Sequence, residues 1–345
     1  MNMTIKQALP GLILAIVVAG VGILLADTPF AHASGLSGLT IAIALGIVLG
    51  NTVYPYFAES AHAGIHFSKQ QLLRLGIIFY GLRITFQQIE SVGMTAILTD
   101  LIVLSSTFIL AYLLGTKVLK MDRETSLLIG AGSSICGAAA VMATEPVVKP
   151  HASKVSIAVA TVVVFGTAGM FLYPMFYHLG QGVLSVFSNQ NRYGIYAGST
   201  IHEVAQVFAA GQAIGAGAAD TAVIVKMIRV MMLAPFLVIL SIWLSRRDVV
   251  AEGEKCRITI PWFAVLFVVM AGVNSLHVLP VTLTHVFTQL DNWMLAMAMA
   301  ALGLTTHLKA IREAGLKPLI LGAILFVYLI FGGALINWCV AHTLV

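Results

Sequence analysis

Long apolar runs separated by short polar breaks cover almost the whole chain. A helix needs about 20 residues to cross the hydrocarbon core of a bilayer, and each run is close to that length. The pattern therefore predicts about eleven membrane-spanning helices. Their ranges are 8–26, 36–53, 71–89, 94–115, 125–144, 155–177, 192–211, 219–244, 259–276, 290–308 and 318–340. No soluble domain intervenes, so residues 1–345 are expected to form a single polytopic all-α membrane domain.

The composition agrees with a chain that is covered by lipid. Its 345 residues are 59% hydrophobic and 10% charged, with a mean hydropathy of +0.97, whereas a soluble domain carries about 25% charged residues. Net charge is +5, but the basic residues lie between apolar runs and form no stripe with aromatic residues, so we expect no nucleic-acid partner. The three cysteines are far apart and form no CxxC pair, so neither a metal site nor a cofactor is predicted.

The distribution of Lys and Arg predicts the orientation in a bacterial inner membrane. Basic loops face the cytoplasm. The basic loops are 116–124, 245–258 and 309–317, and the loops without Lys or Arg are 27–35, 212–218 and 277–289. The N-terminus is thus expected in the cytoplasm and the C-terminus in the periplasm. The first run is longer than the apolar core of a signal peptide, so we interpret it as an uncleaved span.

Two lysines disagree with this orientation. Lys149 and Lys154 fall on the predicted periplasmic side. Either a segment near them is re-entrant, or the lysines lie within the protein for a reason of their own.

The eleven predicted spans divide into one extra span and two sets of five. Residues 36–177 would form the first repeat and 192–340 the second, in opposite orientation, which is the plan of many secondary transporters. The pairing matches span 125–144 with span 290–308, and both carry small and hydroxyl residues that favour a broken helix. Close helix packing through small residues is the alternative.

A second internal similarity does not fit that pairing. Ala131–Ile135 (AGSSI) recurs as Ala197–Ile201 (AGSTI). The two segments would run parallel in an eleven-span topology, so the similarity is either convergence on one kind of ligand-facing surface or chance.

Ionisable residues inside predicted spans are the first candidates for function, because burying each costs about 2.5–3.5 kcal/mol on insertion scales. His202, Glu203 and Gln206 lie in the middle of span 192–211, with His202 and Gln206 on one helical face. Lys226 and Arg229 lie one turn apart inside span 219–244. A ligand or coupling-ion site is the functional interpretation, and an ion pair that locks two helices is the structural one.

Span 125–144 carries the second candidate site. Around Ser133, Ser134, Cys136 and Gly137, the N-terminus of a half-helix could bind an anion. Glu145 precedes Pro146, which disfavours further helix, so Glu145 is expected among free backbone groups or at a helix end. Asp100 is expected at the membrane interface, near the start of its span.

Enzymatic alternatives are weaker. Ser134 and His202 could form the serine–histidine dyad of an intramembrane protease, but hydrogen-bond reach is required and sequence does not show it. No GxxxxGK[ST] or HExxH motif occurs. We therefore expect a protein that is not an enzyme.

Several long strings resemble the YeiH-like family of bacterial inner-membrane proteins. They are Leu128–Ala140, Ala143–Lys149, Gly198–Val207, Lys226–Pro235 and Ala298–Thr306, and the resemblance covers essentially the whole chain. The family was long described as conserved hypothetical and now carries a sulfate-exporter label. The resemblance implies a fold close to cation–proton antiporters and bile-acid symporters, with broken helices.

We therefore predict a secondary transporter of a small anion, such as sulfate or a sulfonate, coupled to a proton or sodium. A cation–proton antiporter with Glu203 and Lys226 as the exchanging pair is the alternative, and a homodimer is left open. The predicted substrate-binding residues are Ser133, Ser134, Cys136, Gly137, Lys226, Arg229, Thr305 and Thr306. The predicted ion-coupling residues are Glu145, His202, Glu203 and Gln206.

Overall fold

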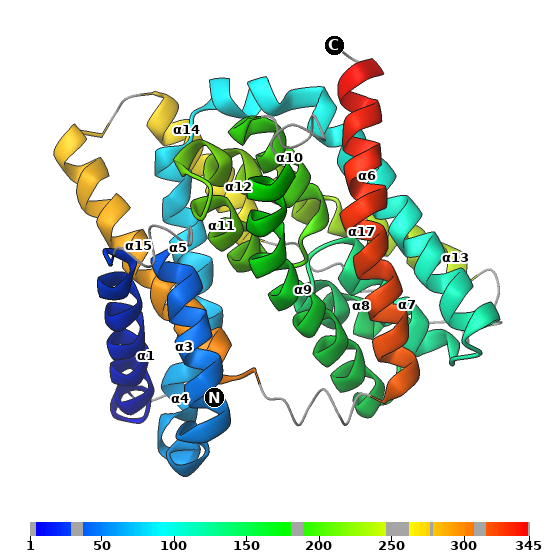
Figure 1. Ribbon diagram of the computed structural model, residues 1–345, viewed down its shortest axis with the longest axis horizontal. Helices are drawn as coiled ribbons and strands as arrows, with labels where there is room; N and C mark the ends of the chain where they lie inside the picture. Colours follow the sequence, from blue (N-terminus) through cyan, green and yellow to red (C-terminus); the bar gives the residue numbers. More distant parts are fainter. Residues whose placement is uncertain are drawn as a thin grey trace. The chain divides into compact units, whose positions relative to one another are not determined.

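The computed structural model describes residues 5–28, 37–180, 189–245, 262–276, 279–306 and 315–343, and within these ranges the secondary structure is helical (Figure 1). The basic loop at 245–258 and most of the one at 309–317 lie outside the described residues. Among the described helices, five are long and apolar enough to cross a membrane: Gln7–Ala26, Val92–Val118, Ser153–His178, Ala216–Ser245 and Leu316–Thr343. This confirms an all-α membrane protein, while the predicted count of eleven spans in two inverted repeats goes beyond this finding.

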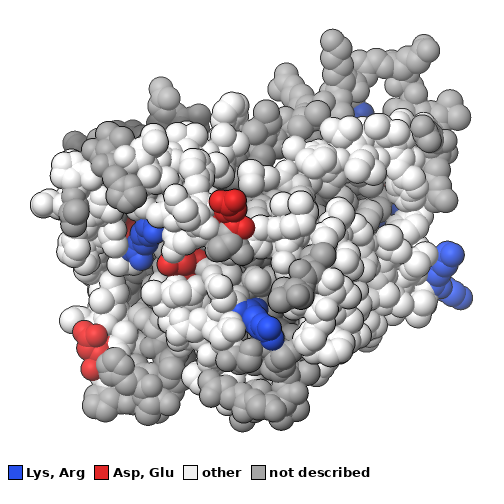
Figure 2. Space-filling view, turned by 90° about the horizontal axis from the view of Figure 1, so that it is seen from above, with Lys and Arg blue, Asp and Glu red and all other residues white. Residues whose placement is uncertain are grey.

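Large apolar side chains are exposed on these helices, as expected where lipid covers a surface. Leu24, Ile239 and Phe331 are 67% to 72% exposed. On the face drawn in Figure 2 only a few isolated charged side chains are visible among the described residues.

The chain divides into two compact units. Unit 1 contains residues 1–91, 208–216 and 262–308, and unit 2 contains residues 92–207, 217–261 and 309–345. Each unit therefore takes segments from both predicted repeats, 36–177 and 192–340.

Unit 1 is a bundle of helices in close contact. Its helices are α1 (Ile5–Ala26), α3 (Gly38–Thr52), α4 (Ala58–Phe67), α5 (Leu73–Tyr80), α14 (Trp262–Ser275) and α15 (Val281–Leu304). A Cβ on Gly11 would lie 2.7 Å from Gly64 Cα, and one on Gly46 would lie 3.0 Å from Gly303 Cα. Glycine at these positions lets the helix backbones touch, as is common between helices in membranes.

Unit 2 holds most of the predicted site residues. Its helices are α6 (Phe86–Leu113, in this unit from Val92), α7 (Arg123–Ser134), α8 (Ala138–Val148), α9 (Ala152–Gly180), α10 (Gln190–Thr200), the start of α11 (Val204–Gln212), α12 (Ala216–Met231, in this unit from Gly217), α13 (Leu233–Ser245) and α17 (Leu316–Thr343). Figure 1 shows them with their labels.

Helices α7 and α8 form a helical hairpin, here called hairpin 1 (residues 123–148). A Cβ on Gly132 would lie 2.8 Å from Val141 Cγ2, across the turn. At the open end, Lys154 Nζ at the start of α9 lies 3.2 Å from Asp122 Oδ2 and 3.0 Å from Glu124 Oε2. A single helix from 123 to 148 would separate its ends by about 39 Å at 1.5 Å per residue. The chain therefore returns to where it entered, so residues 123–148 form a hairpin and not one continuous helix.

Helices α10 and α11 form hairpin 2 (residues 190–212) by the same reasoning. Helix α12 runs parallel to α10, since Cβ atoms on Gly194 and Gly198 would lie 2.9 Å from Ala218 O and 2.6 Å from Ala222 O. A Cβ on Gly217 would lie 3.0 Å from Gln190 Oε1, so the start of α12 lies beside the start of α10. The chain between Thr200 and Gly217 must therefore return to the end at which α10 began.

The two hairpins point toward each other from opposite ends of α9. Helix α7 runs parallel to α9, because Gly132 packs on Val162 as Asp122 pairs with Lys154. Helix α10 runs antiparallel to α9, because Tyr193 packs on Tyr177 and Tyr196 stacks on Tyr173. The recurring segments 131–135 and 197–201 end these two opposed helices, so they belong to an inverted pair. The expectation that they run parallel was wrong, because it assumed that each segment crosses the membrane.

The structure shows a second break at residues 201–203, in hairpin 2. In span 290–308, helix α15 runs from Val281 to Leu304 and ends at the small and hydroxyl residues of this span, and residues 307–314 lie outside the described part of the chain. Pro146 does not end α8, since the helix continues to Val148 and ends at Lys149, whose φ is 52°. Pro146 has no N–H to donate to the carbonyl four residues earlier. Because α8 is short, that carbonyl lies in the first half of the helix.

Candidate functional site: charges at the hairpin tips

The tip of hairpin 1 needs glycine. Ile135 leaves the helix at φ −123° and ψ −82°, and Gly137 follows at φ 67° and ψ −134°. L-residues rarely adopt a positive φ of this kind. A Cβ on Gly137 would also lie 2.5 Å from Glu203 Cγ. The tips of the two hairpins are thus in direct contact at Gly137.

Two buried cations of α12 hold the tips together. Lys226 and Arg229 are both 0% exposed. Lys226 Nζ donates to Ile135 O at 2.6 Å and to Ile201 O at 2.7 Å, which are equivalent carbonyls of the recurring segments. Arg229 Nε donates to Ser134 O at 2.7 Å, and its Nη1 donates to Ser199 O. Each cation therefore bonds to both hairpins.

These positions match the electrostatics of the helix ends. The last carbonyls of α7 and α10 carry the negative ends of the helix dipoles, and cations are favourable there. Glu203 lies at the opposite kind of end: its Oε1 is 3.4 Å from Ala138 N, at the start of α8. Its own N–H donates to Gln206 Oε1 at 3.2 Å, which is the reciprocal contact of a capping box at the start of α11. Three of the four half-helix ends at the tips thus face a side chain of opposite charge, and the start of α11 faces the neutral amide of Gln206.

A fourth charged residue of the cluster, Asp100, was not among the site residues predicted from the sequence. Asp100 of α6 is 0% exposed, and among the described residues neither of its carboxylate oxygens has a hydrogen-bond partner. The positive charges that act on it are those of Arg229 and Lys226. The candidate span that contains it begins at Val92, so Asp100 lies about 12 Å along the helix at 1.5 Å per residue. Asp100 was expected at the membrane interface, and the structure gives it a fully buried side chain.

A periodic pattern could have revealed Asp100. The inward stripe of α6 consists of small, hydroxyl and acidic side chains that are all 0% exposed: Ala96, Thr99, Asp100, Val103, Thr107 and Ala111. Their spacing follows one helix face, and bulky apolar residues such as Ile97 and Leu101 occupy the outer face.

Most predicted site residues come together at the tips, some in roles other than those expected. Ser133 and Ser134 end α7, so the backbone there offers carbonyls to cations and not N–H groups to an anion. Ser134 Oγ donates to Ala131 O at 3.3 Å. His202 is buried in the break before α11, so it does not share a helical face with Gln206. Cys136 is buried in the other break.

The other three predicted residues belong to the far end of α8 and to unit 1. Glu145 is partly buried in the last turns of α8. Thr305 and Thr306 follow α15 in unit 1, where both hydroxyls donate to Leu302 O.

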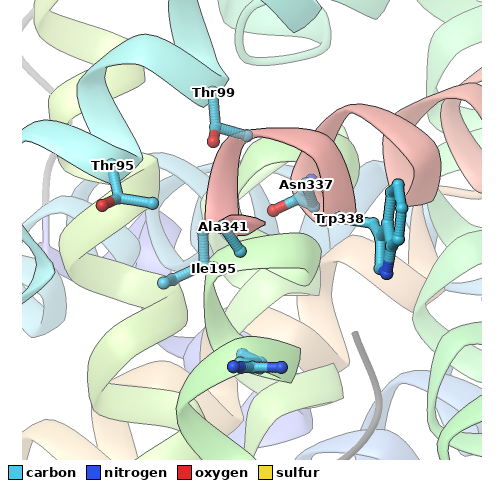
Figure 3. A pocket seen from close by; sticks show the side chains of 7 residues that line it. Thr95, Thr99, Ile195, Asn337, Trp338 and Ala341 are labelled. Atoms are coloured by element: carbon cyan, nitrogen blue, oxygen red, sulfur yellow. The ribbon is translucent and has the colours of Figure 1, made fainter. Parts of the chain in front are cut away.

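A pocket of unit 2 leads toward the cluster. Side chains of α6, α10 and α17 line it: Thr95, Thr99, Arg192, Ile195, Asn337, Trp338 and Ala341 (Figure 3). Asn337 Nδ2 donates to Ser199 Oγ at 3.1 Å, and Ser199 O accepts from Arg229. Thr99 is the neighbour of Asp100 in sequence. Polar groups therefore continue from the pocket to Arg229 on one side and to Asp100 on the other.

Fold and site define a polytopic membrane protein with two opposed helical hairpins around a buried charge cluster. Within this class the chain belongs to the family described as conserved hypothetical protein 698, whose profile matches residues 10–322. It is 56% identical over 335 residues to UPF0324 membrane protein PA5383 of Pseudomonas aeruginosa, which covers 96% of this chain and 94% of that protein. It is 54% identical over 337 residues to UPF0324 inner membrane protein YeiH of Escherichia coli (strain K12), covering 98% and 95%. These relatives confirm the YeiH-like resemblance and a membrane protein.

Proposed function

We propose that this protein is a secondary transporter that carries a small oxyanion past the tips of its two hairpins. The observation that carries the proposal is Arg229. It is fully buried between the tips, and its Nη2 has no hydrogen-bond partner among the described residues. A guanidinium is permanently charged and presents a planar fork that suits oxyanions. Sulfate or a small sulfonate fits this chemistry and agrees with the label of the family.

The helix architecture supports transport in particular. Non-helical backbone inside a membrane is tolerated where it is buried in protein or lines a cavity, and discontinuous helices form the substrate sites of many transporters. Hairpins that enter from opposite ends of α9 would leave the site between two short barriers. Movement of one hairpin at a time would then open the site to one side of the membrane, with a proton or sodium as the coupling ion.

Cation–proton antiport is the second candidate, and a specific observation favours it. The cluster contains two carboxylates, Glu203 and Asp100, and carboxylates are the usual ligands and proton carriers in cation exchange. The two candidates differ in what Arg229 does, since it would bind substrate in the first and only hold the hairpins together in the second.

Flux into proteoliposomes tests the proposal. Radiolabelled sulfate and ethanesulfonate should accumulate under an imposed pH or sodium gradient, and Arg229→Lys should lower the rate about tenfold or more, since a hydrogen bond to a charged group contributes about 1.5–3 kcal/mol. The matched control is Arg83→Lys, because Arg83 pairs with the buried Asp291 in unit 1 at 2.5 Å and is outside the proposed site. Exchange of sodium for protons without flux of any anion would instead establish the antiporter.

A further inference from the structure

Asp100 is the most unusual carboxyl group in unit 2. It is fully buried, and neither oxygen accepts a hydrogen bond from any described residue. The hydroxyls of Thr99 and Thr107 lie on the same inward stripe of α6. They are also buried and have no hydrogen-bond partner among the described residues. An ionised carboxylate without donors is costly in an apolar interior. The positive charges of Arg229 and Lys226 oppose that cost, so neither protonation state is strongly excluded.

The protonation state of Asp100 sets the net charge of the cluster. When Asp100 is ionised, Lys226 and Arg229 face two carboxylates, Asp100 and Glu203, and the formal charges cancel. When Asp100 takes up a proton on one oxygen, the cluster carries one positive charge. The other titratable groups near the tips, His202, Cys136, Glu203 and Tyr173, act on Lys226 or Arg229. Once Asp100 is protonated, its negative charge no longer acts on Arg229, and Arg229 Nη2 can donate to an added anion.

We propose that Asp100 binds the coupling proton and that its protonation makes the cluster competent to hold the oxyanion at Arg229. The inference rests on the transport function proposed above and names the residue that couples it. Proton and anion then bind together, and by linkage each tightens the binding of the other. The pocket that reaches Thr99 supplies polar side chains one residue from the carboxyl group.

Thermal unfolding of the purified protein in sulfate measures the coupling. For wild type, apparent sulfate affinity should fall about tenfold per pH unit above the titration midpoint of Asp100, as expected for one linked proton. Asp100→Asn should bind sulfate with little pH dependence, at the strength wild type shows at low pH. Asp100→Glu keeps a carboxyl group and should keep the pH dependence. Asp291→Asn is the matched control, because Asp291 is equally buried but belongs to unit 1.

Infrared difference spectra between about pH 5 and pH 8 test the proton without any anion. Carbonyl bands of protonated carboxyls should titrate in wild type, and Asp291→Asn and Asp100→Asn should each lose the band of the replaced residue, because both side chains are buried. The band that is lost only in Asp100→Asn belongs to Asp100. Sulfate binding by Asp100→Asn with the pH dependence of wild type, or an unchanged infrared band, would overturn the assignment. If no anion stabilises wild type at any pH, the proposed substrate is wrong, whereas the infrared result still decides whether Asp100 carries the proton.

Discussion

At the scale of single residues, the contact between the hairpin tips depends on Gly137. Gly137 and Gly93 have similar backbone angles, with φ 67° and ψ −134° at the first and φ 35° and ψ −138° at the second. A Cβ on Gly137 would lie 2.5 Å from Glu203 Cγ, whereas one on Gly93 would have no atom within 4 Å among the described residues. Alanine at Gly93 therefore tests backbone strain alone, whereas alanine at Gly137 tests backbone strain together with the contact between the tips.

We expect Gly137→Ala to destabilise the protein more than Gly93→Ala. Both should lose about 1–3 kcal/mol from backbone strain, and Gly137→Ala should lose about 1–3 kcal/mol more, as overpacked sites do. Glu203 would also have to leave the N-terminus of α8, so transport should fall in this variant alone. Thermal unfolding in detergent and liposome flux would measure the two effects. Equal losses would mean that the tips do not press on each other at Gly137.

Sequence identified several residues of this cluster but not their partners. Lys226, Arg229 and Glu203 were predictable, because charge inside an apolar run is costly and needs a reason. Asp100 belongs to the same category but lies close to the predicted start of its span, where a charged residue is cheap. The candidate span begins at Val92, two residues before the predicted start, so the position of Asp100 along the helix was predicted well. Its burial depends on which helices cover this face of α6, and hydropathy does not show that.

At the scale of helices, hydropathy predicts position and not direction. Residues 125–144 and 192–211 are apolar enough to cross, yet each reverses at three residues near its middle. A re-entrant hairpin and a continuous span bury similar amounts of apolar surface, so a sliding window does not separate them. The clues were the small residues of AGSSI and AGSTI and the lysines on the wrong side, of which Lys154 closes the open end of hairpin 1.

Asp122 ties that open end together and gives it a predictable pH dependence. As the N-cap of α7, its carboxylate accepts from Thr125 N at 2.9 Å and lies 3.2 Å from Lys154 Nζ. Burial alone would raise the pKa of Asp122, but the hydrogen bonds from Thr125 and Lys154 outweigh it and lower the pKa. A lowered folded-state pKa stabilises the protein above the ordinary value of about 4, and the contribution is lost as the pH falls through the lowered value.

Asp122→Asn should therefore be less stable than wild type near neutral pH, with the difference shrinking as the pH falls below about 4. Asparagine keeps the capping acceptor and removes only the charge. Because the pair is partly exposed, the difference should be below about 1 kcal/mol, and Lys154→Met should reproduce it. Thermal midpoints measured across this pH range would check the trend. A difference that is constant with pH would assign the effect to the cap and not to the charge.

At the scale of the whole molecule, the hairpins change the topology. Eleven predicted spans with two of them re-entrant leave nine crossings, and both counts are odd. The C-terminus is therefore expected in the periplasm in either case, and a fusion after Val345 does not separate the two topologies. Residues 149–154 separate the two topologies, because they follow hairpin 1 and their side of the membrane depends on whether hairpin 1 crosses. With nine crossings they return to the cytoplasmic side with Lys117 and Lys120, so Lys149 and Lys154 then agree with the positive-inside pattern.

Thiol accessibility tests this topology directly. In a background without Cys136, Cys256 and Cys339, single cysteines at Lys149 and Lys117 should both react with a membrane-impermeant reagent in inside-out vesicles and not in intact cells. Both lysines are exposed, so failure to react would reflect sidedness and not burial. An eleven-crossing chain would place Lys149 on the periplasmic side and reverse its labelling relative to Lys117. That result would mean that hairpin 1 crosses the membrane, and the two recurring segments would then run parallel and no longer face each other as an inverted pair.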